Sequence, residues 1–162
     1  SWLRRLREAR LSPGVREYTA VVDGYAKAGD AESAAAWLGR MVEARQAPNL
    51  HSFSAVIAGC AAAGDVARGA AWLGRTRLAG LAPNCVAYTS LVSGSARQGD
   101  LEQARRWFEE MARASVAPDV AAYTALLGAY ARRGELAAAS RLFSQMQRSG
   151  CRPDALCYSV MV

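Results

Sequence analysis

Two sets of small polar residues recur along the chain every 35 residues, and they are its best candidates for chemistry. The first set is a hydroxyl that directly follows an aromatic residue: Thr19, Ser54, Thr89, Thr124 and Ser159. The second set is an amide or a carboxylate that directly follows a proline: Asn49, Asn84, Asp119 and Asp154. An amide offers a hydrogen-bond donor and an acceptor, whereas a carboxylate only accepts. A core position has no reason to be a hydroxyl in every copy, so these groups are candidates for binding a ligand.

The residue types that catalysis or metal binding would need are scarce. The four cysteines form no C-x-x-C pair, and the only histidine is His51. This pattern argues against a zinc site and against a Cys/His catalytic pair, so we expect no enzyme activity and no cofactor. No apolar run approaches the roughly 20 residues that a membrane span needs, so we expect no membrane partner.

The polar residues are positioned by a tandem repeat. All five prolines lie 35 residues apart, at Pro13, Pro48, Pro83, Pro118 and Pro153. A strict period of this length is typical of a repeat protein in which each unit packs only on its neighbours. We therefore divide the chain into the end of a preceding repeat, four full repeats and the start of a fifth: residues 1–14, 15–49, 50–84, 85–119, 120–154 and 155–162.

Each repeat has the pattern of two helices. In residues 15–49 an apolar stripe with helical spacing runs from Tyr18 to Ala26, and Gly29 then offers a left-handed helix end. Asp30 follows as a helix cap, and its counterparts are Asp65, Asp100 and the poorer capping residue Glu135. Trp2, Trp37, Trp72 and Trp107 share one column of the second helices, which we interpret as core between neighbouring helices. The pattern predicts an all-α solenoid with first helices on one surface and second helices on the other.

These features resemble the pentatricopeptide repeat family. The resemblance rests on the 35-residue period, the Pro-Asn/Asp junction, the aromatic followed by a small hydroxyl, and the Gly-Asp turn. Tetratricopeptide repeats differ, because their period is 34 residues and their W-x-x-L-G motif lies in the first helix, whereas Trp37-Leu38-Gly39 falls in the second. The resemblance implies an α-solenoid wound as a right-handed superhelix.

The resemblance also implies a function. Members of the family bind single-stranded RNA in mitochondria or plastids, one base per repeat, and act in RNA processing, stability or translation. The implied base-reading pairs are Thr19 with Asn49, Ser54 with Asn84, Thr89 with Asp119, and Thr124 with Asp154, while Ser159 begins a fifth pair. In the family these combinations go with the site 5′-AAGG-3′.

The chemistry of the pairs fits these bases. The pairing edge of adenine shows one acceptor and one donor, which a side-chain amide matches, and that of guanine shows two donors, which a carboxylate accepts. A second interpretation remains open, because Asn and Asp after proline favour turns and Thr or Ser is a common helix cap. That interpretation does not readily account for a hydroxyl after the aromatic in all five copies.

The resemblance implies two further sets of contacts. Residues that would stack between bases are Arg16, His51, Val86, Ala121 and Leu156, of which Ala121 is a poor clamp. Residues that would lie near phosphates are Lys27, Arg97 and Arg132, and the second repeat has Ala62 at this position. Each of these cations is also favoured at a helix C-terminus by the macrodipole.

The alternative function is a structural scaffold subunit of a large organellar assembly such as a ribosome, with protein or RNA neighbours. The net charge of +6 suits an anionic partner, but it also serves solubility. Arginines such as Arg40, Arg75 and Arg141 fall on second helices, away from the expected RNA surface. The H-x-E and C-x-x-C motifs of a deaminase extension are absent from the sequence.

Overall fold

The computed structural model describes residues 13–161, and within these residues every regular element is an α-helix. The expectations for the end of the preceding repeat and for Trp2 fall on residues 1–12, outside the described part. The helices are α2 (Val15–Lys27), α3 (Ala31–Glu43), α4 (Leu50–Ala62), α5 (Val66–Leu78), α6 (Cys85–Arg97), α7 (Leu101–Arg113), α8 (Val120–Arg132), α9 (Leu136–Arg148) and α10 (Ala155–Met161).

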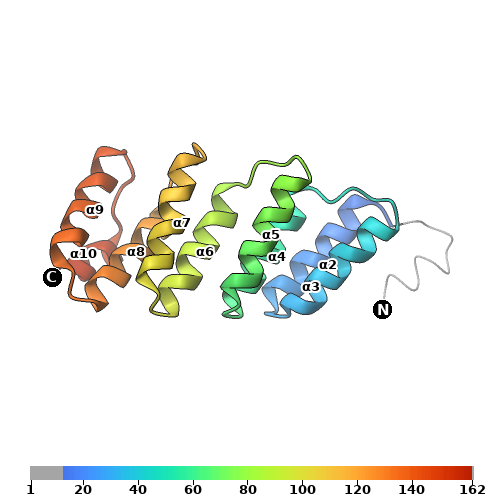
Figure 1. Cartoon of the computed structure of the whole chain (residues 1–162), viewed down its shortest axis with the longest axis horizontal. Coiled ribbons are helices and arrows are strands. Elements are labelled where there is room, and N and C mark those ends of the chain that lie inside the picture. Colours follow the sequence, from blue (N-terminus) through green and yellow to red (C-terminus); the bar gives the residue numbers. More distant parts are fainter. Residues whose placement is uncertain (1–12, 162) are drawn as a thin grey trace.

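The helices stand as antiparallel pairs in a row, as predicted for an all-α solenoid (Figure 1). Each of α2, α4, α6 and α8 packs on the next helix of the same kind, so these first helices and α10 make one layer. The second helices α3, α5, α7 and α9 make the other layer, and α3, α5 and α7 also contact the first helix of the following pair. No described helix has the length and hydrophobicity of a membrane span.

The predicted turn residues end and begin the helices. Gly99, in the turn between α6 and α7, adopts a φ of +78°, a left-handed conformation that suits glycine. Asp100 then accepts a hydrogen bond from the backbone N–H of Gln103 at 2.9 Å and caps α7. Asp30 and Asp65 cap α3 and α5 in the same way, whereas the side chain of Glu135 makes no cap bond to α9.

Small residues set the distance between first helices. A Cβ added to Gly59 would lie 3.1 Å from Ala26 Cα, and one added to Gly94 would lie 3.1 Å from Ala61 Cβ and 3.2 Å from Ala61 O. Contacts this short leave no room for a larger side chain. The spacing of α2, α4 and α6 is therefore set by the close contact of Gly59 with Ala26 and of Gly94 with Ala61.

The tryptophan column is core only in part. Trp72 is buried, but Trp37 and Trp107 are half-buried against the core. The guanidinium groups of Arg40 and Arg75 cover the rings of Trp37 and Trp72 at 4.5 and 4.3 Å. Trp37 and Trp72 each pack on an aromatic residue of their own repeat, with ring centroids 6.3 Å from Tyr18 and Phe53 respectively. Ring contacts between repeats come from Phe108, which meets Tyr123 edge-on at 5.1 Å, and from Phe143, which meets Tyr158 edge-on at 5.4 Å.

A strained turn predicts a stabilising substitution. Ser115 follows α7 with a φ of +57°, where the equivalent residues after α5 and α9 are Gly80 and Gly150. A residue with a Cβ in this conformation costs about 1 kcal/mol, partly offset by the greater freedom of glycine in the unfolded chain. We expect Ser115→Gly to raise the free energy of unfolding by about 0.5 kcal/mol in urea titrations, and Gly80→Ser to lower it. Equal unfolding midpoints for all three proteins would contradict this account.

Candidate nucleic-acid interface

The Asn and Asp residues after the prolines are helix caps. Asn84 Oδ1 accepts the backbone N–H of Ala87 at 3.1 Å, and Asp119 Oδ1 accepts that of Ala122 at 2.8 Å. Asn49 caps α4 and Asp154 caps α10 in the same way. The backbone N–H of Cys157 lowers the pKa of the Asp154 carboxyl, which keeps this group an ionised acceptor. The turn interpretation of these residues is therefore correct, but it accounts only for the hydrogen bond at Oδ1 of each side chain.

The two central pairs are also joined across neighbouring repeats. The Ser54 hydroxyl lies 2.9 Å from Asn84 Oδ1 and 2.8 Å from the Leu50 carbonyl oxygen, so its single hydrogen is shared between these two acceptors. The Thr89 hydroxyl donates to Asp119 Oδ1 at 3.0 Å. The partners in each pair lie 30 residues apart in the sequence. The structure thus brings together the second and third pairs that the sequence singles out.

In the outer pairs the hydroxyl bonds elsewhere. Thr19 donates to the carbonyl of Val15 at 2.7 Å, and Thr124 donates to that of Val120 at 2.7 Å. The thiol of Cys157 also lies 3.1 Å from the Thr124 hydroxyl. Within the described residues neither Thr19 with Asn49 nor Thr124 with Asp154 forms a hydrogen bond, and Ser159 donates to its own helix at Leu156. None of these hydroxyls acts as a helix cap.

The hydrogen bonds decide which atoms stay available in the central pairs. Asn84 Oδ1 receives both the cap N–H and the Ser54 hydroxyl, so the NH₂ group of Asn84 is the part left for a ligand. Asp119 Oδ1 likewise receives two donors, which leaves Oδ2 as an acceptor. The second repeat therefore offers a donor and the third an acceptor.

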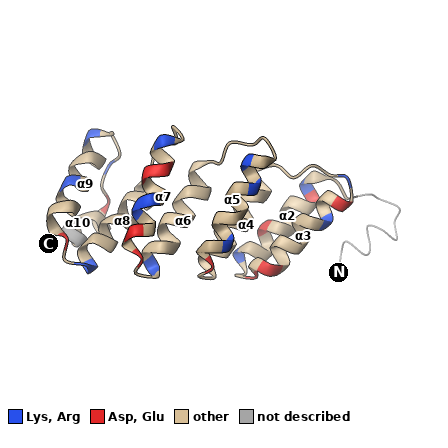
Figure 2. Ribbon diagram, viewed as in Figure 1, with Lys and Arg blue, Asp and Glu red and all other residues tan. Residues whose placement is uncertain are grey.

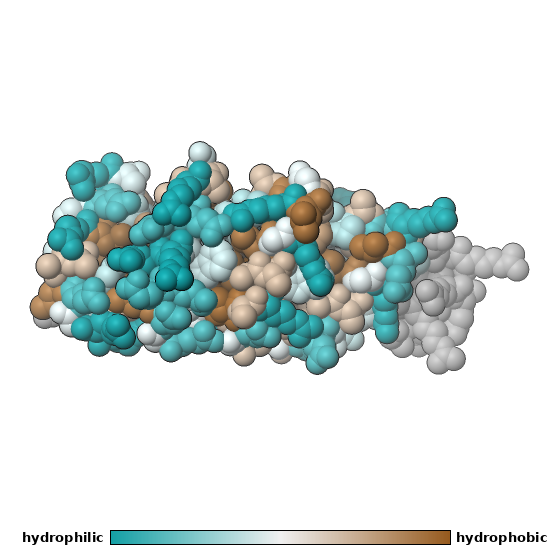
Figure 3. Space-filling view, viewed as in Figure 1, coloured by the Kyte–Doolittle hydropathy of each residue, from teal (hydrophilic) through white to brown (hydrophobic). Residues whose placement is uncertain are grey.

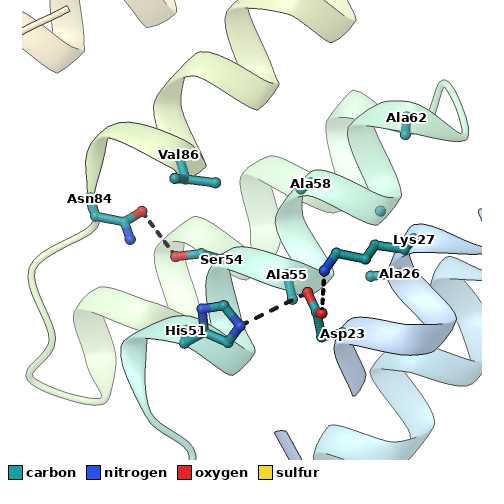
Figure 4. Close-up of a pocket in the computed structure, with 11 residues that line it drawn as sticks. Asp23, Ala26, Lys27, His51, Ser54, Ala55, Ala58, Ala62, Asn84 and Val86 are labelled. Carbon is teal, nitrogen blue, oxygen red and sulfur yellow. Dashed lines mark hydrogen bonds and ion pairs between the residues drawn. The ribbon is translucent and has the colours of Figure 1, made fainter. Parts of the chain in front are cut away.

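A pocket opens beside the Ser54–Asn84 pair, between α2 and α4 (Figure 4). Its volume is about 360 Å³, which is within the range of small-ligand sites. Besides the pair, Asp23, Lys27, His51 and Val86 line it together with a floor of alanines. The side chain of Val86, from the following repeat, is 54% exposed, and that of His51 is 68% exposed. A flat ligand in this pocket would have His51 and Val86 within reach.

A second pocket of about 250 Å³ lies two repeats further along, between α6 and α8. It is lined by Ser93, Arg97, Thr124, Arg132 and Leu156, each 70 residues after a position that lines the first pocket. The groove along the first helices thus presents equivalent lining positions again after two repeats. Of the predicted stacking residues, Arg16 and Ala121 are exposed but line neither pocket.

The three predicted phosphate-binding cations have different partners. Arg97 donates to the carbonyl of Ala61 at 2.8 Å, and Arg132 donates to that of Ala96 at 2.7 Å. Each arginine therefore caps the C-terminal end of the preceding first helix and not the end of its own helix. A helix C-terminus is where the macrodipole favours a cation. A guanidinium has five N–H groups, so one such bond leaves the others available to an anion. Lys27 instead pairs with Asp23 at 2.7 Å.

Comparison with known proteins identifies the family. A family model described as a pentatricopeptide repeat domain matches residues 3–62, and one described as the PPR repeat family matches residues 83–127 and 118–162. The chain belongs to the pentatricopeptide repeat family. A comparison with curated proteins finds no significant match.

Solved pentatricopeptide repeat structures share the fold. The crystal structure of the maize protein PPR10 in complex with an 18-nt psaJ RNA element is 30% identical, with a TM-score of 0.79 over 96% of this chain. This chain spans 23% of PPR10. The PPR domain of Arabidopsis thaliana protein-only RNase P 1, in complex with tRNA, has a TM-score of 0.83 at 14% identity and aligns over 98% of this chain and 84% of its own. At that identity the likeness shows the pentatricopeptide repeat fold alone.

Proposed function

We propose that this pentatricopeptide repeat chain is a sequence-selective, single-stranded RNA-binding module. In this proposal each repeat contacts one base through its hydroxyl and the Asn or Asp that follows the next proline. The observation that carries the proposal is the Ser54–Asn84 pair, which is held together by a hydrogen bond and lines a pocket between first helices. A structure of PPR10 with bound RNA, at 30% identity, supports the same class of ligand.

The free atoms of the central pairs favour particular bases. The NH₂ group of Asn84 would donate to the N1 acceptor of adenine, and Asp119 Oδ2 would accept an N–H from the pairing edge of guanine. The short hydroxyls of Ser54 and Thr89 leave space for a purine. Extended to the outer pairs by their residue types, the proposed site is 5′-AAGG-3′. Four positions match about one random site in 256, so these repeats would supply part of a longer recognition site.

The first test is the salt dependence of binding. Because Asp23 already neutralises Lys27, we expect only Arg97 and Arg132 to contact phosphates. The logarithm of affinity should then fall with the logarithm of salt concentration at a slope of roughly −1.4, given about −0.7 per phosphate on single strands. Fluorescence anisotropy with labelled, unstructured RNA containing 5′-AAGG-3′ measures this slope. A slope near zero, or equal affinity for duplex RNA, would contradict binding in the groove.

A second candidate function, a scaffold subunit with protein neighbours, is favoured by the outer layer. Helices α5 and α9 carry arginines and no acidic residue (Figure 2). Leu78 at the end of α5 is 90% exposed and Val42 at the end of α3 is 56% exposed, and Figure 3 shows hydrophobic residues among the hydrophilic ones on this face. Selection from a randomised RNA pool separates the two functions, because a scaffold would enrich no motif. For either function we propose a mitochondrial or plastid location.

A further inference from the structure

The two pockets of the groove are lined by equivalent positions of the repeat but differ in charge. At the position of Asp23 in the first pocket, the second pocket has Ser93. At the position of Ala62 in the first pocket, the second has Arg132, while Lys27 corresponds to Arg97. The α6–α8 pocket therefore holds two cations and no acid, and the α2–α4 pocket holds one cation next to one acid.

The carboxylate of Asp23 lies between two groups that would otherwise face a ligand (Figure 4). Its Oδ2 is 2.7 Å from Lys27 Nζ, and its Oδ1 is 3.9 Å from His51 Nε2. Among the described first helices only α2 contains acidic residues, and its other one, Glu17, accepts the backbone N–H of Gly14 at 2.9 Å. Asp23 is thus an acidic side chain within the groove that no cap or turn requires.

The Asp23–Lys27 pair has little structural value. The Lys27 side chain is 76% exposed, and exposed ion pairs four residues apart on a helix typically contribute only a few tenths of a kcal/mol. A carboxylate in a groove for RNA, however, repels phosphates. Here it also forms an ion pair with Lys27, the one lysine or arginine among the described residues that line its pocket. The placement of Asp23 therefore matters more for ligand binding than for folding.

We propose that Asp23 is a negative determinant of RNA binding, which holds Lys27 away from the phosphate backbone and concentrates phosphate binding at Arg97 and Arg132. This inference rests on the proposed function. It predicts a groove in which the α6–α8 pocket dominates affinity and the α2–α4 pocket contributes mainly contacts to the base. Asp23 thus lowers the affinity of the first repeats for RNA of any sequence.

The test is Asp23→Ser, which copies the residue of the second pocket. We expect the affinity for an oligoribonucleotide containing 5′-AAGG-3′ to rise about fivefold at 0.1 M salt, because one more phosphate contact with a slope of about −0.7 gives roughly this gain relative to 1 M salt. The salt slope should steepen by about 0.7 because one more phosphate is bound. The reciprocal change, Ser93→Asp, should lower affinity by a similar factor and make the slope shallower.

Two controls separate this mechanism from a general effect of charge. Glu43→Ser removes the same charge from the exposed end of α3, outside the groove, and should change affinity by less than twofold. Adding Lys27→Ala to Asp23→Ser should abolish the gain, because the released lysine is its source. Asp23→Asn repeats the test without changing side-chain size, and circular dichroism confirms that each variant is folded.

The outcomes are distinct for the two proposals. If neither the original chain nor any variant binds RNA, the proposed function fails. If the original chain binds RNA but Asp23→Ser gains no more than Glu43→Ser, the function stands and the role of Asp23 is overturned. A gain that survives the loss of Lys27 would also overturn it.

Discussion

Replacing Asp119 by asparagine is expected to move the preference of the third repeat from guanine to adenine. The substitution turns the free acceptor Oδ2 into an NH₂ donor, while Oδ1 continues to receive the N–H of Ala122 and the hydroxyl of Thr89. Asn84 shows that asparagine supports the same arrangement one repeat earlier. A good contact to a base edge is worth about 1–3 kcal/mol, or roughly fivefold to 150-fold in relative affinity.

Competition between 5′-AAGG-3′ and 5′-AAAG-3′, embedded in the same unstructured RNA, measures this switch. Asp119→Ala should lose the preference without gaining another, and it should also destabilise α8 because the cap is lost. Asp154→Asn is the matched control, since it should change only the fourth base. If the original and Asp119→Asn proteins bind both RNAs alike, Asp119 is a helix cap and nothing more, and the scaffold function becomes the better one.

Replacing Gly94 by leucine is expected to destabilise the array by about 2 kcal/mol or more. Its Cβ alone would lie 3.0 Å from Val66 Cγ2 and 3.2 Å from the Ala61 carbonyl oxygen, so the rest of the side chain would push α6 away from α4. Overpacking of this kind costs about 1–3 kcal/mol, and here the nearest groups include backbone, which yields less than a side chain. Chemical denaturation monitored by circular dichroism measures the change in the free energy of unfolding.

Gly24→Leu is the matched control, in the same column two repeats earlier. Among the described residues no atom lies within 4 Å of a Cβ at Gly24, so the higher helix propensity of leucine should prevail and the variant should be more stable by up to about 1 kcal/mol. The two substitutions thus change stability in opposite directions. A similar loss at both positions would mean that the spacing between first helices is not set by contact at Gly94.

Much of the fold follows from the sequence because its signals are local. Asp100 and Gly99 mark a helix boundary through their own backbone preferences, and repetition every 35 residues strengthens each such signal. The partial exposure of Trp37 was not predictable, because a hydrophobic residue on the correct stripe does not reveal whether a neighbouring helix or Arg40 covers it.

The site was less accessible from the sequence. The base-reading roles proposed for Ser54 and Asn84 rest on family resemblance, and the packing of α4 on α6 explains why these two residues meet. The bond from Arg97 to Ala61 spans 36 residues and depends on helix spacing, which periodicity does not give. The Asp23–Lys27 pair, by contrast, has the four-residue spacing of a helical ion pair and was open to prediction.

The arginine bonds to preceding helices also bear on the elasticity of the solenoid. Arg97 joins α6 to the end of α4, and Arg132 joins α8 to the end of α6. At the seam between α2 and α4 the equivalent residue is Ala62, so this arginine bond is missing there and the Asp23–His51 contact is long, at 3.9 Å. In a linear array each seam deforms almost independently of the others. When the superhelix lengthens or shortens, its pitch should therefore change first between α2 and α4, where the arginine bond is missing.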